Sequence, residues 1–271
     1  MGWLSIRKFN LSVSNFRNRI QSNLHKAARG NHKSFRIVAD QYLNFITEYL
    51  VVAGYHEEER IRHYCGEIYH NLWLRIAYLR RVSDFESQLF VLLKTIPVNV
   101  APFQDLLTQK LIMLNSLQRF LVVGRDLENW SAKNLSLSSR RTKQELKKPL
   151  FDAWIIMTGF RRDTIEFATN ECMEKVVEHM KGILEQSEHR RLCKKVKQNA
   201  IASEFKAECL QLRCELVELR QNARWTDDYK REFLNDLIED ISAIEPLKAE
   251  LTEKLKNQTS FQYVPLEVRN N

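Results

Sequence analysis

The sequence predicts an all-α protein in which two small helical domains precede a C-terminal helical hairpin or coiled-coil extension. Glycine and proline are scarce, at 7 and 5 of 271 residues, which favours helices over sheets. Apolar residues recur every three or four positions through most of the chain, which is the period of an amphipathic helix. A hydrophobic content of 44% supports folded cores. No run approaches the roughly 18 apolar residues of a membrane span, and the first residues lack the apolar run of a secretory signal.

The first third of the chain is expected to hold four helices. A basic helix at 11–28, ended by Gly30, lies in an N-terminal segment over residues 1–32. The first domain, 33–97, opens with a helix that buries Phe35, Val38, Tyr42, Phe45, Ile46 and Leu50. Its second helix starts after Gly54 with the favourable acidic residues Glu57–Glu59, and buries Ile61, Tyr64, Ile68, Leu72, Ile76 and Leu79. Its third helix, 85–96, is capped by Ser83-Asp84 and ended by Pro97.

The rest of the chain is expected to form a second domain and a helical extension. A short linker at 98–103 leads to the second domain at 104–158, the extension covers 159–258, and residues 259–271 form a loose tail. The extension carries a heptad seam at Phe205, Cys209, Leu212, Leu216 and Leu219. After a turn near 222–228, a facing seam follows at Phe233, Leu237, Ile241 and Ile244, and Pro246 kinks or restarts the last helix.

Positive charge is concentrated in the first 170 residues. Residues 1–98 hold 14 Lys+Arg against 8 Asp+Glu, a net charge of +6, and residues 99–170 add +4. Residues 171–271 have a net charge of −2. A basic surface attracts a phosphate backbone through counterion release, although ordinary solvated lysines and arginines give the same excess.

No catalytic or cofactor site is expected. The chain has no glycine-rich phosphate loop, no HExxH and no paired CxxC, so we expect no enzyme and no cofactor. Five cysteines are an odd number in a chain of this length, which favours a reduced, intracellular and cytoplasmic protein. The one metal-like set is His189, Cys193, Cys209 and Cys214. Because Cys209 lies in the apolar seam, packing is favoured over zinc, and the metal question stays open.

The segment Glu67-Ile68-Tyr69-His70-Asn71-Leu72-Trp73 resembles the core-binding helix of bacterial RNA polymerase sigma factors of the extracytoplasmic-function type. Phe85 and the apolar run after it are similar to the start of the family's next helix. The resemblance implies a sigma-2-like domain that binds the coiled coil of the polymerase β′ subunit. It implies polymerase-binding roles for Glu67, His70, Asn71, Trp73 and Arg75.

A second segment resembles the helix-turn-helix domain of the same family. Leu127–Ser131 is similar to its turn, Leu135 to an apolar position of its short helix, and Arg141–Leu146 to its DNA-reading helix. The resemblance implies a sigma-4-like domain that binds promoter DNA and the polymerase β flap. Together the two domains imply these DNA-binding residues: Arg80, Arg81, Gln88, Lys94, Arg140, Arg141, Lys143, Gln144, Lys147 and Lys148.

The departures from the family pattern lie mainly in the DNA-reading parts. Gly66 and Gln88 replace the usual glutamine and tryptophan, and Pro97 shortens the promoter-melting helix. The short helix and turn at 131–139 are compact, and Pro149 is expected to interrupt the reading helix. These changes imply reduced or altered promoter reading. Another factor would then direct the protein, such as an anti-sigma factor, an activator or an RNA-guided, nuclease-dead CRISPR effector that docks on residues 159–258.

Two functions therefore follow from the sequence. The first is a sigma-like transcription initiation factor that binds core RNA polymerase and directs it to DNA. The second is a helical scaffold or adaptor that binds a partner through its C-terminal heptads, with only incidental DNA contact.

Overall fold

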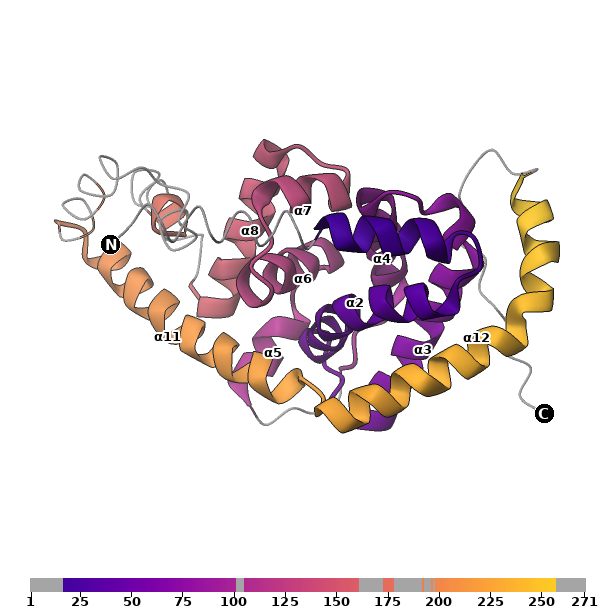
Figure 1. The fold of residues 1–271 in the computed structure, drawn as a ribbon. Coiled ribbons are helices and arrows are strands. Elements are labelled where there is room, and N and C mark those ends of the chain that lie inside the picture. The colour runs from indigo at the N-terminus through magenta and orange to yellow at the C-terminus, as the bar shows by residue number, and fades with distance from the viewer. Residues whose placement is uncertain are drawn as a thin grey trace, which may run out of the picture. The chain divides into compact units, whose positions relative to one another are not determined.

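The computed structural model describes residues 17–100, 105–160, 173–177 and 198–256, together with positions 192 and 196. Beyond residue 244 it describes only the backbone. Within these ranges every regular element is a helix and no strand occurs, so the predicted all-α class is confirmed (Figure 1). None of these helices has the length and apolar character needed to cross a bilayer.

The helices belong to two compact units, and each unit gathers segments that are distant in sequence. Unit 1 comprises residues 1–42, 62–95 and 226–271, and unit 2 comprises residues 43–61 and 96–225. The helices of the first half are α2 (His32–Val52), α3 (Glu58–Leu74), the 3₁₀ turn η1 (Ile76–Tyr78) and α4 (Val82–Thr95). Those of the second half are α5 (Leu106–Ile112), α6 (Ser116–Val122), the π-helical segment η2 (Val123–Leu127), α7 (Ala132–Ser139), α8 (Lys143–Thr158), α11 (Ala200–Ala223) and α12 (Asp227–Lys256).

This division differs from the contiguous domains expected at 33–97 and 104–158. Residues 43–61 belong with unit 2, and residues 226–271 belong with unit 1. The expected extension at 159–258 is therefore not a separate part, because its last helix contributes to unit 1 and α11 contributes to unit 2. Asn99, in the described part of the expected linker, donates from its side chain to the Gly54 carbonyl of unit 2 at 2.9 Å, and residues 101–103 lie outside the described residues.

Unit 1 is built around aromatic contacts between the first half of α2 and α3. The Phe35 ring lies 5.0 Å from the ring of Trp73 and 6.3 Å from that of Tyr69. The Tyr69 hydroxyl donates to the Ala39 carbonyl at 2.7 Å, which satisfies its polar end inside the core. All four residues are buried. Phe35 meets Trp73 and Ala39 meets Tyr69, so the two helices run antiparallel.

A buried carboxylate joins the helix at 17–27 to α4 in the same unit. Glu86 on α4 is 4% exposed, and it accepts hydrogen bonds from Arg17 at 2.6 Å and from the Tyr42 hydroxyl at 3.0 Å. Because a buried carboxyl group without partners is costly, these two donors stabilise Glu86 inside the unit. Burial, followed by the charge of Glu86, raises the pKa of Tyr42, which therefore stays a neutral donor.

The start of α4 is set by a residue from another helix. Helix α4 begins at Val82, three residues before the predicted start, so the cap predicted at Ser83-Asp84 is wrong. The Gln21 side chain accepts a hydrogen bond from the Val82 backbone N–H at 3.1 Å and donates to the Arg80 carbonyl. The free N–H of the first turn is thus satisfied by tertiary contact rather than by a local cap.

The two predicted seams each pack on a different helix from the one expected. Phe205 on α11 lies 6.4 Å from the ring of Phe151 on α8, and Phe233 on α12 lies 6.3 Å from the ring of Tyr69 on α3. The seam positions Phe205, Cys209, Leu212, Leu216, Phe233, Leu237 and Ile241 are buried as predicted, whereas Leu219 and Ile244 are half-buried. The facing hairpin predicted from them is wrong. A kink or a restart was expected at Pro246. Helix α12 continues through this proline, and its ribbon bends in the C-terminal third (Figure 1).

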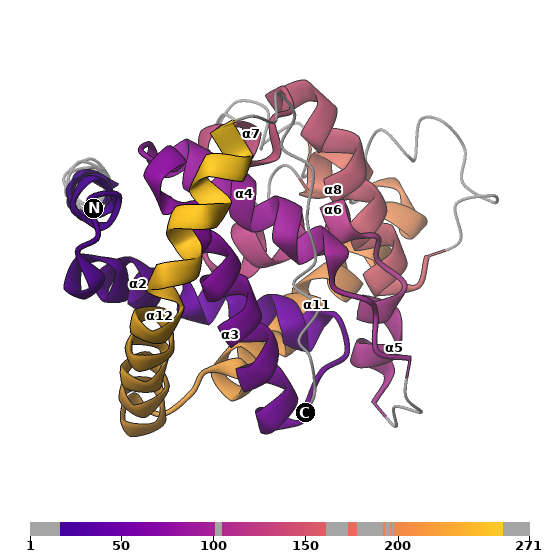
Figure 2. The ribbon, with the colours of Figure 1, turned by 90° about the vertical axis from the view of Figure 1, so that its right-hand side faces the viewer.

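In unit 2, a close contact at Gly124 brings η2 against α7. A Cβ added at Gly124 would lie 2.7 Å from Leu135 Cδ2 and 3.6 Å from the Trp130 ring. Trp130 stacks on Phe45 of α2, with 4.5 Å between ring centroids and an interplanar angle of 17°. A Cβ at this position would force the Leu135 side chain to shift, so glycine suits the close approach of η2 to the short helix α7. Helices α6 and α8 lie side by side in the same unit (Figure 2).

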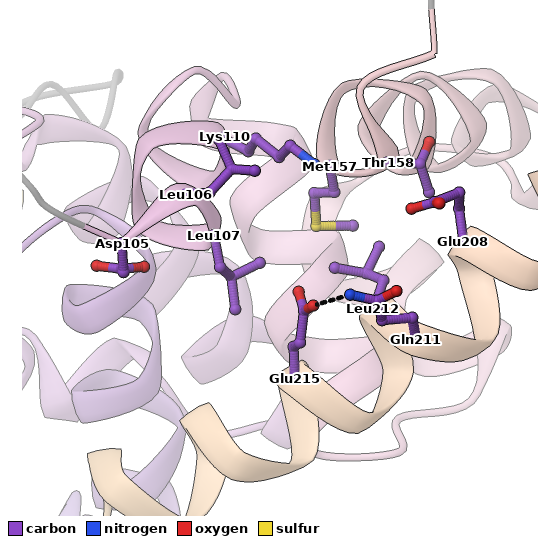
Figure 3. Close-up of a pocket in the computed structure, with 10 residues that line it drawn as sticks. All are labelled: Asp105, Leu106, Leu107, Lys110, Met157, Thr158, Glu208, Gln211, Leu212 and Glu215. Atoms are coloured by element: carbon purple, nitrogen blue, oxygen red, sulfur yellow. Dashed lines mark hydrogen bonds between the residues drawn. The ribbon is translucent and has the colours of Figure 1, made fainter.

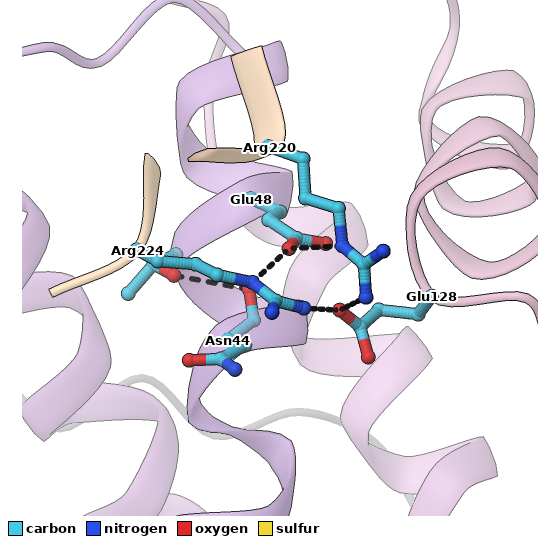
Figure 4. A network of polar contacts seen from close by, with 6 residues as sticks. Asn44, Glu48, Glu128, Arg220 and Arg224 are labelled. Carbon is cyan, nitrogen blue, oxygen red and sulfur yellow. Dashed lines mark hydrogen bonds and ion pairs between the residues drawn. The ribbon is translucent and has the colours of Figure 1, made fainter. Parts of the chain in front are cut away.

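The C-terminal end of α11 is held by two arginines on two carboxylates of unit 2 (Figure 4). Arg224 donates from Nε to Glu48 at 3.2 Å and from Nη2 to Glu128 at 2.6 Å. Arg220 Nε lies 3.6 Å from Glu48, and Arg220 Nη2 lies 3.4 Å from Glu128. Glu48 has no exposed side-chain surface, and its Oε2 atom has no hydrogen-bond partner among the described residues. Burial raises the pKa of Glu48 to about 8, the Glu128 carboxylate acts in the same direction, and Arg224 opposes them.

We predict that Gly124→Ala lowers the free energy of unfolding by about 1–3 kcal/mol, because the new methyl group overpacks the buried contact with Leu135. Gly66→Ala is the matched control. Gly66 lies inside α3 with no atom within 4 Å of an added Cβ, so the change should stabilise the helix by about 1 kcal/mol. Urea unfolding followed by circular dichroism measures both changes, and equal effects would contradict the packing of η2 on α7.

We predict that the free energy of unfolding falls as pH rises from about 5 to about 8. The folded chain holds the Glu48 proton up to a pKa of about 8, whereas the unfolded chain releases it near the ordinary value. Protonated Glu48 therefore contributes to the free energy of unfolding at low pH, and this contribution is lost as pH rises through the pKa of the folded state. Glu48→Gln keeps the side-chain shape but cannot ionise, so it should remove a decline of about 1–4 kcal/mol.

Glu218→Gln, at an exposed position of α11, is the control for this pH effect. Urea unfolding at several pH values should give this variant the wild-type profile. A Glu48→Gln protein whose stability declines with pH as the wild type does would show that Glu48 is not the titrating group.

Candidate functional site

Unit 2 contains two helices joined by a three-residue turn. Helix α7 ends at Ser139 and α8 begins at Lys143. Arg140 between them adopts a left-handed conformation with φ 54° and ψ 39°, which turns the chain sharply. Of the short helix and turn predicted at 131–139, the helix is α7, and the turn follows at 140–142. Ser131 caps α7 and accepts from the Asn134 N–H at 3.1 Å. The arrangement is a pair of consecutive helices joined by a tight turn.

A capping box fixes the first turn of α8. The Thr142 side chain accepts from the Glu145 N–H at 3.2 Å, and Glu145 accepts from the Thr142 N–H at 2.6 Å. The backbone hydrogen bond from Thr142 lowers the pKa of Glu145, so this carboxylate is ionised at neutral pH. Glu145 is thereby held at the cap, where it satisfies the backbone.

One face of α8 exposes cations and an amide. Lys143, Gln144, Lys147 and Lys148 occupy positions i, i+1, i+4 and i+5, which share a helical face. All four are exposed, as are Arg140 and Arg141 in the turn, while Leu146 on the opposite side is buried. The structure thus brings all six predicted DNA-binding residues of this segment onto the second helix and the turn before it.

The expected interruption of this helix by Pro149 is wrong. Helix α8 runs for 16 residues from Lys143 to Thr158 with Pro149 inside it. Burial of its C-terminal half, including Phe151 and Trp154, keeps the helix together, and Trp154 Nε1 also donates to Asp126 at 3.2 Å. Tertiary packing therefore outweighs the missing backbone hydrogen bond.

The second predicted surface lies on α3 in unit 1. Glu67, His70 and Asn71 are half-buried neighbours on one side of the helix. The Asn71 side chain donates to the Glu67 carbonyl at 2.9 Å, and Glu67 lies 3.7 Å from His63. Burial lowers the pKa of His70, while the carboxylates of Asp240 and Glu67 act in the opposite direction. This side of α3 thus offers one carboxylate, one amide and one imidazole.

Three other predicted residues of unit 1 are inside it. Trp73 has no exposed surface and packs against Phe35 and His32, Arg75 is 5% exposed, and Gln88 is 8% exposed. Because these three side chains are buried in the core, they are not exposed for direct contact with a polymerase or with DNA. Arg80, Arg81 and Lys94 are exposed.

A hollow of about 320 Å³ lies in unit 2 between α5, α8 and α11 (Figure 3). Its lining includes Asp105, Lys110, Glu208 and Glu215. Asp105 accepts from the Thr108 N–H at 2.6 Å as the cap of α5, and Glu215 accepts from Gln211 at 2.9 Å. Two of its three carboxylates are thus used within their own helices, and no nucleophile–base pair lines it.

No cluster of three or more metal-ligating side chains occurs among the residues that the structure describes. Cys209 is buried in the α11 seam and Cys214 is exposed on the same helix. His189 and Cys193, the other members of the metal-like set, lie outside the described residues. Cys65 is buried in α3, and burial raises the pKa of its thiol well above the usual range.

The contribution of α12 to the α3 surface was missed from the sequence. Asp240 on α12 lies 3.8 Å from His70, and Asp236 and Glu232 pair with Arg62. The signal was present, because Glu232, Asp236 and Asp240 recur every four residues and form one acidic stripe.

A comparison of this chain with known protein families, curated proteins and solved structures finds no match.

Proposed function

We propose that this chain is a sigma-like transcription initiation factor that binds core RNA polymerase and contacts promoter DNA. The observation that carries the proposal is the α7–turn–α8 pair, in which a short, tightly turned helix precedes a helix with an exposed basic face. In a helix-turn-helix, the second helix enters the major groove and its N-terminal residues contact the DNA. Five cations between Arg140 and Lys148 suit a phosphate backbone.

The side chains available at this helix indicate how DNA would be read. Lysines on the α8 face suit phosphate contacts, which position a protein without selecting a sequence. Gln144 is the one exposed amide among them, and glutamine can pair with the edge of adenine. One base-reading side chain among several phosphate-binding ones agrees with reduced or altered promoter reading, with part of the target choice supplied by another protein.

The α3 surface supports the polymerase-binding half of the proposal. Glu67, His70 and Asn71 share one side of a helix whose opposite side packs in the unit 1 core. A docking surface of this kind needs polar side chains on a rigid element. Buried Trp73 and Arg75 would contribute by keeping α3 in place.

A helical adaptor is the second candidate, and one observation favours it. Ala207, Leu210, Cys214 and Val217 on α11 are exposed and follow a 3–4–3 spacing, with Leu210 at 50% and Val217 at 49% exposure. This is a second apolar stripe on a helix whose inner seam is already packed, and such stripes bind partner helices. An adaptor would not copurify with core RNA polymerase.

Replacing two lysines of the α8 face should weaken DNA binding in a salt-dependent way. For Lys143→Ala/Lys147→Ala, we expect the slope of log affinity against log salt concentration to fall in magnitude by about 2, because each lost phosphate contact removes about 0.9. Lys206→Ala/Arg213→Ala on α11 is the matched control and should leave the slope unchanged. Fluorescence anisotropy with duplex DNA measures both. Equal losses would indicate non-specific binding over the whole basic surface.

Glu67→Ala/Asn71→Ala should reduce copurification with bacterial core RNA polymerase by about tenfold or more, because two polar contacts at the docking surface are lost. The exposed pair Glu218→Ala/Gln221→Ala on α11 serves as control. Thermal unfolding should be the same for all three proteins, which separates docking from stability. A double variant of α3 that binds polymerase as the wild type does would disprove this docking surface.

A further inference from the structure

Helix α12 lies along both α2 and α3 inside unit 1 (Figures 1 and 2). Its contacts with α3 advance in the same direction, from Arg62 with Asp236 to His70 with Asp240. Its contacts with α2 advance in opposite directions, from Asp40 with Lys230 at 2.9 Å to His32 with Ser242 at 3.1 Å. The helix therefore occupies the groove between the two, parallel to α3 and antiparallel to α2.

Among the polar contacts between α12 and α3, one arginine makes several. Arg62 pairs with Asp236 and lies 3.5 Å from Glu232. Its guanidinium also lies 5.1 Å from the ring centroid of Tyr229 and 5.6 Å from that of Phe233. The acidic residues contributed by α12 are 53–65% exposed, so water and salt screen these pairs strongly.

The apolar attachment of α12 is narrow. Phe233, Leu234, Leu237 and Ile241 are its buried side chains within the described part of the helix. The other contacts given for its described side chains include ion pairs, cation–π contacts of Arg62 and single hydrogen bonds, such as Arg36 to Asn235 at 3.2 Å. A helix held by one apolar line and screened pairs can open without unfolding the core beneath it.

The same helix reaches the proposed docking surface at its edge. His70, a neighbour of Glu67 and Asn71 on α3, lies 3.8 Å from Asp240 on α12. Asp240 therefore already pairs with an imidazole that a partner docking at Glu67 and Asn71 would also reach. A partner helix and α12 would compete for this imidazole.

We propose that α12 is a strap, defined here as residues 227–244, that masks the edge of the polymerase-docking surface on α3 and lowers the affinity for polymerase until it is displaced. The inference rests on the proposed function. The closed strap leaves only the open fraction of molecules competent to bind, so the apparent affinity is reduced by that fraction. Docking on polymerase and seating of α12 then exclude each other at His70.

Two full-length variants test the strap in opposite directions. Asp236→Asn/Asp240→Asn removes the charges facing Arg62 and His70, and should bind bacterial core RNA polymerase about tenfold more tightly. Asn235→Asp places a carboxylate beside Arg36, whose buried Nε has no hydrogen-bond partner among the described residues, and should weaken binding by several-fold. Glu239→Gln, an exposed change on the same helix, is the control and should bind as the wild type does.

Hydrogen exchange on the same proteins reports the strap without polymerase. The amides of 227–244 should exchange faster in the Asp236→Asn/Asp240→Asn variant and slower in Asn235→Asp, with the amides of α3 unchanged. If α12 and α3 exchange only together, the strap is overturned. If exchange in α12 shifts but all chains bind polymerase equally, the strap is overturned while the docking surface stands. If neither the wild type nor any variant binds polymerase, the proposed function fails and the strap fails with it.

Discussion

The second half of α2 is buried around its whole circumference, and unit 2 depends on this constraint. Residues 45–55 are buried without a break, so this stretch has no solvent face. A helix that is buried on all sides must be surrounded by other elements. Phe120 and Trp130 cover Phe45, and the C-terminal end of α11 reaches Glu48. The placement of η2, α7 and α11 follows from the need to cover this helix.

Most helices could be predicted from the sequence because the signals that define them are local. Apolar spacing located α2 and α3, glycine at positions 30 and 54 marked two ends with positive φ, and Pro97 follows the end of α4. Signals that depend on distant residues could not be seen. Gln21 caps α4 from another helix, and packing carries α8 through Pro149. Periodicity shows that α11 and α12 each have a buried face, but not which helix covers it.

The candidate site was predictable to a different extent in each unit. The basic residues of 140–148 are consecutive on one exposed helix face, so their grouping follows from local geometry. On α3 and α4, the spacing alone does not distinguish a polar side chain at the surface from one inside. The burial of Arg75 and Gln88 could not be predicted for that reason. The covering of His70 by Asp240 joins residues 170 positions apart, and only the folded chain brings them together.

The arrangement of Glu48 with Arg220 and Arg224 has a consequence for how this sequence can change. Losing Glu48 alone leaves two guanidinium groups facing Glu128 only, and losing both arginines leaves the buried Glu48 carboxyl group without the donors that pair with it. Single substitutions therefore pass through a destabilised intermediate, whereas a coordinated change to apolar residues does not. Diverging copies of this chain should retain the three residues as a set or lose them as a set. Such joint variation between the middle of α2 and the end of α11 would identify chains that share this core even where little else in the sequence agrees.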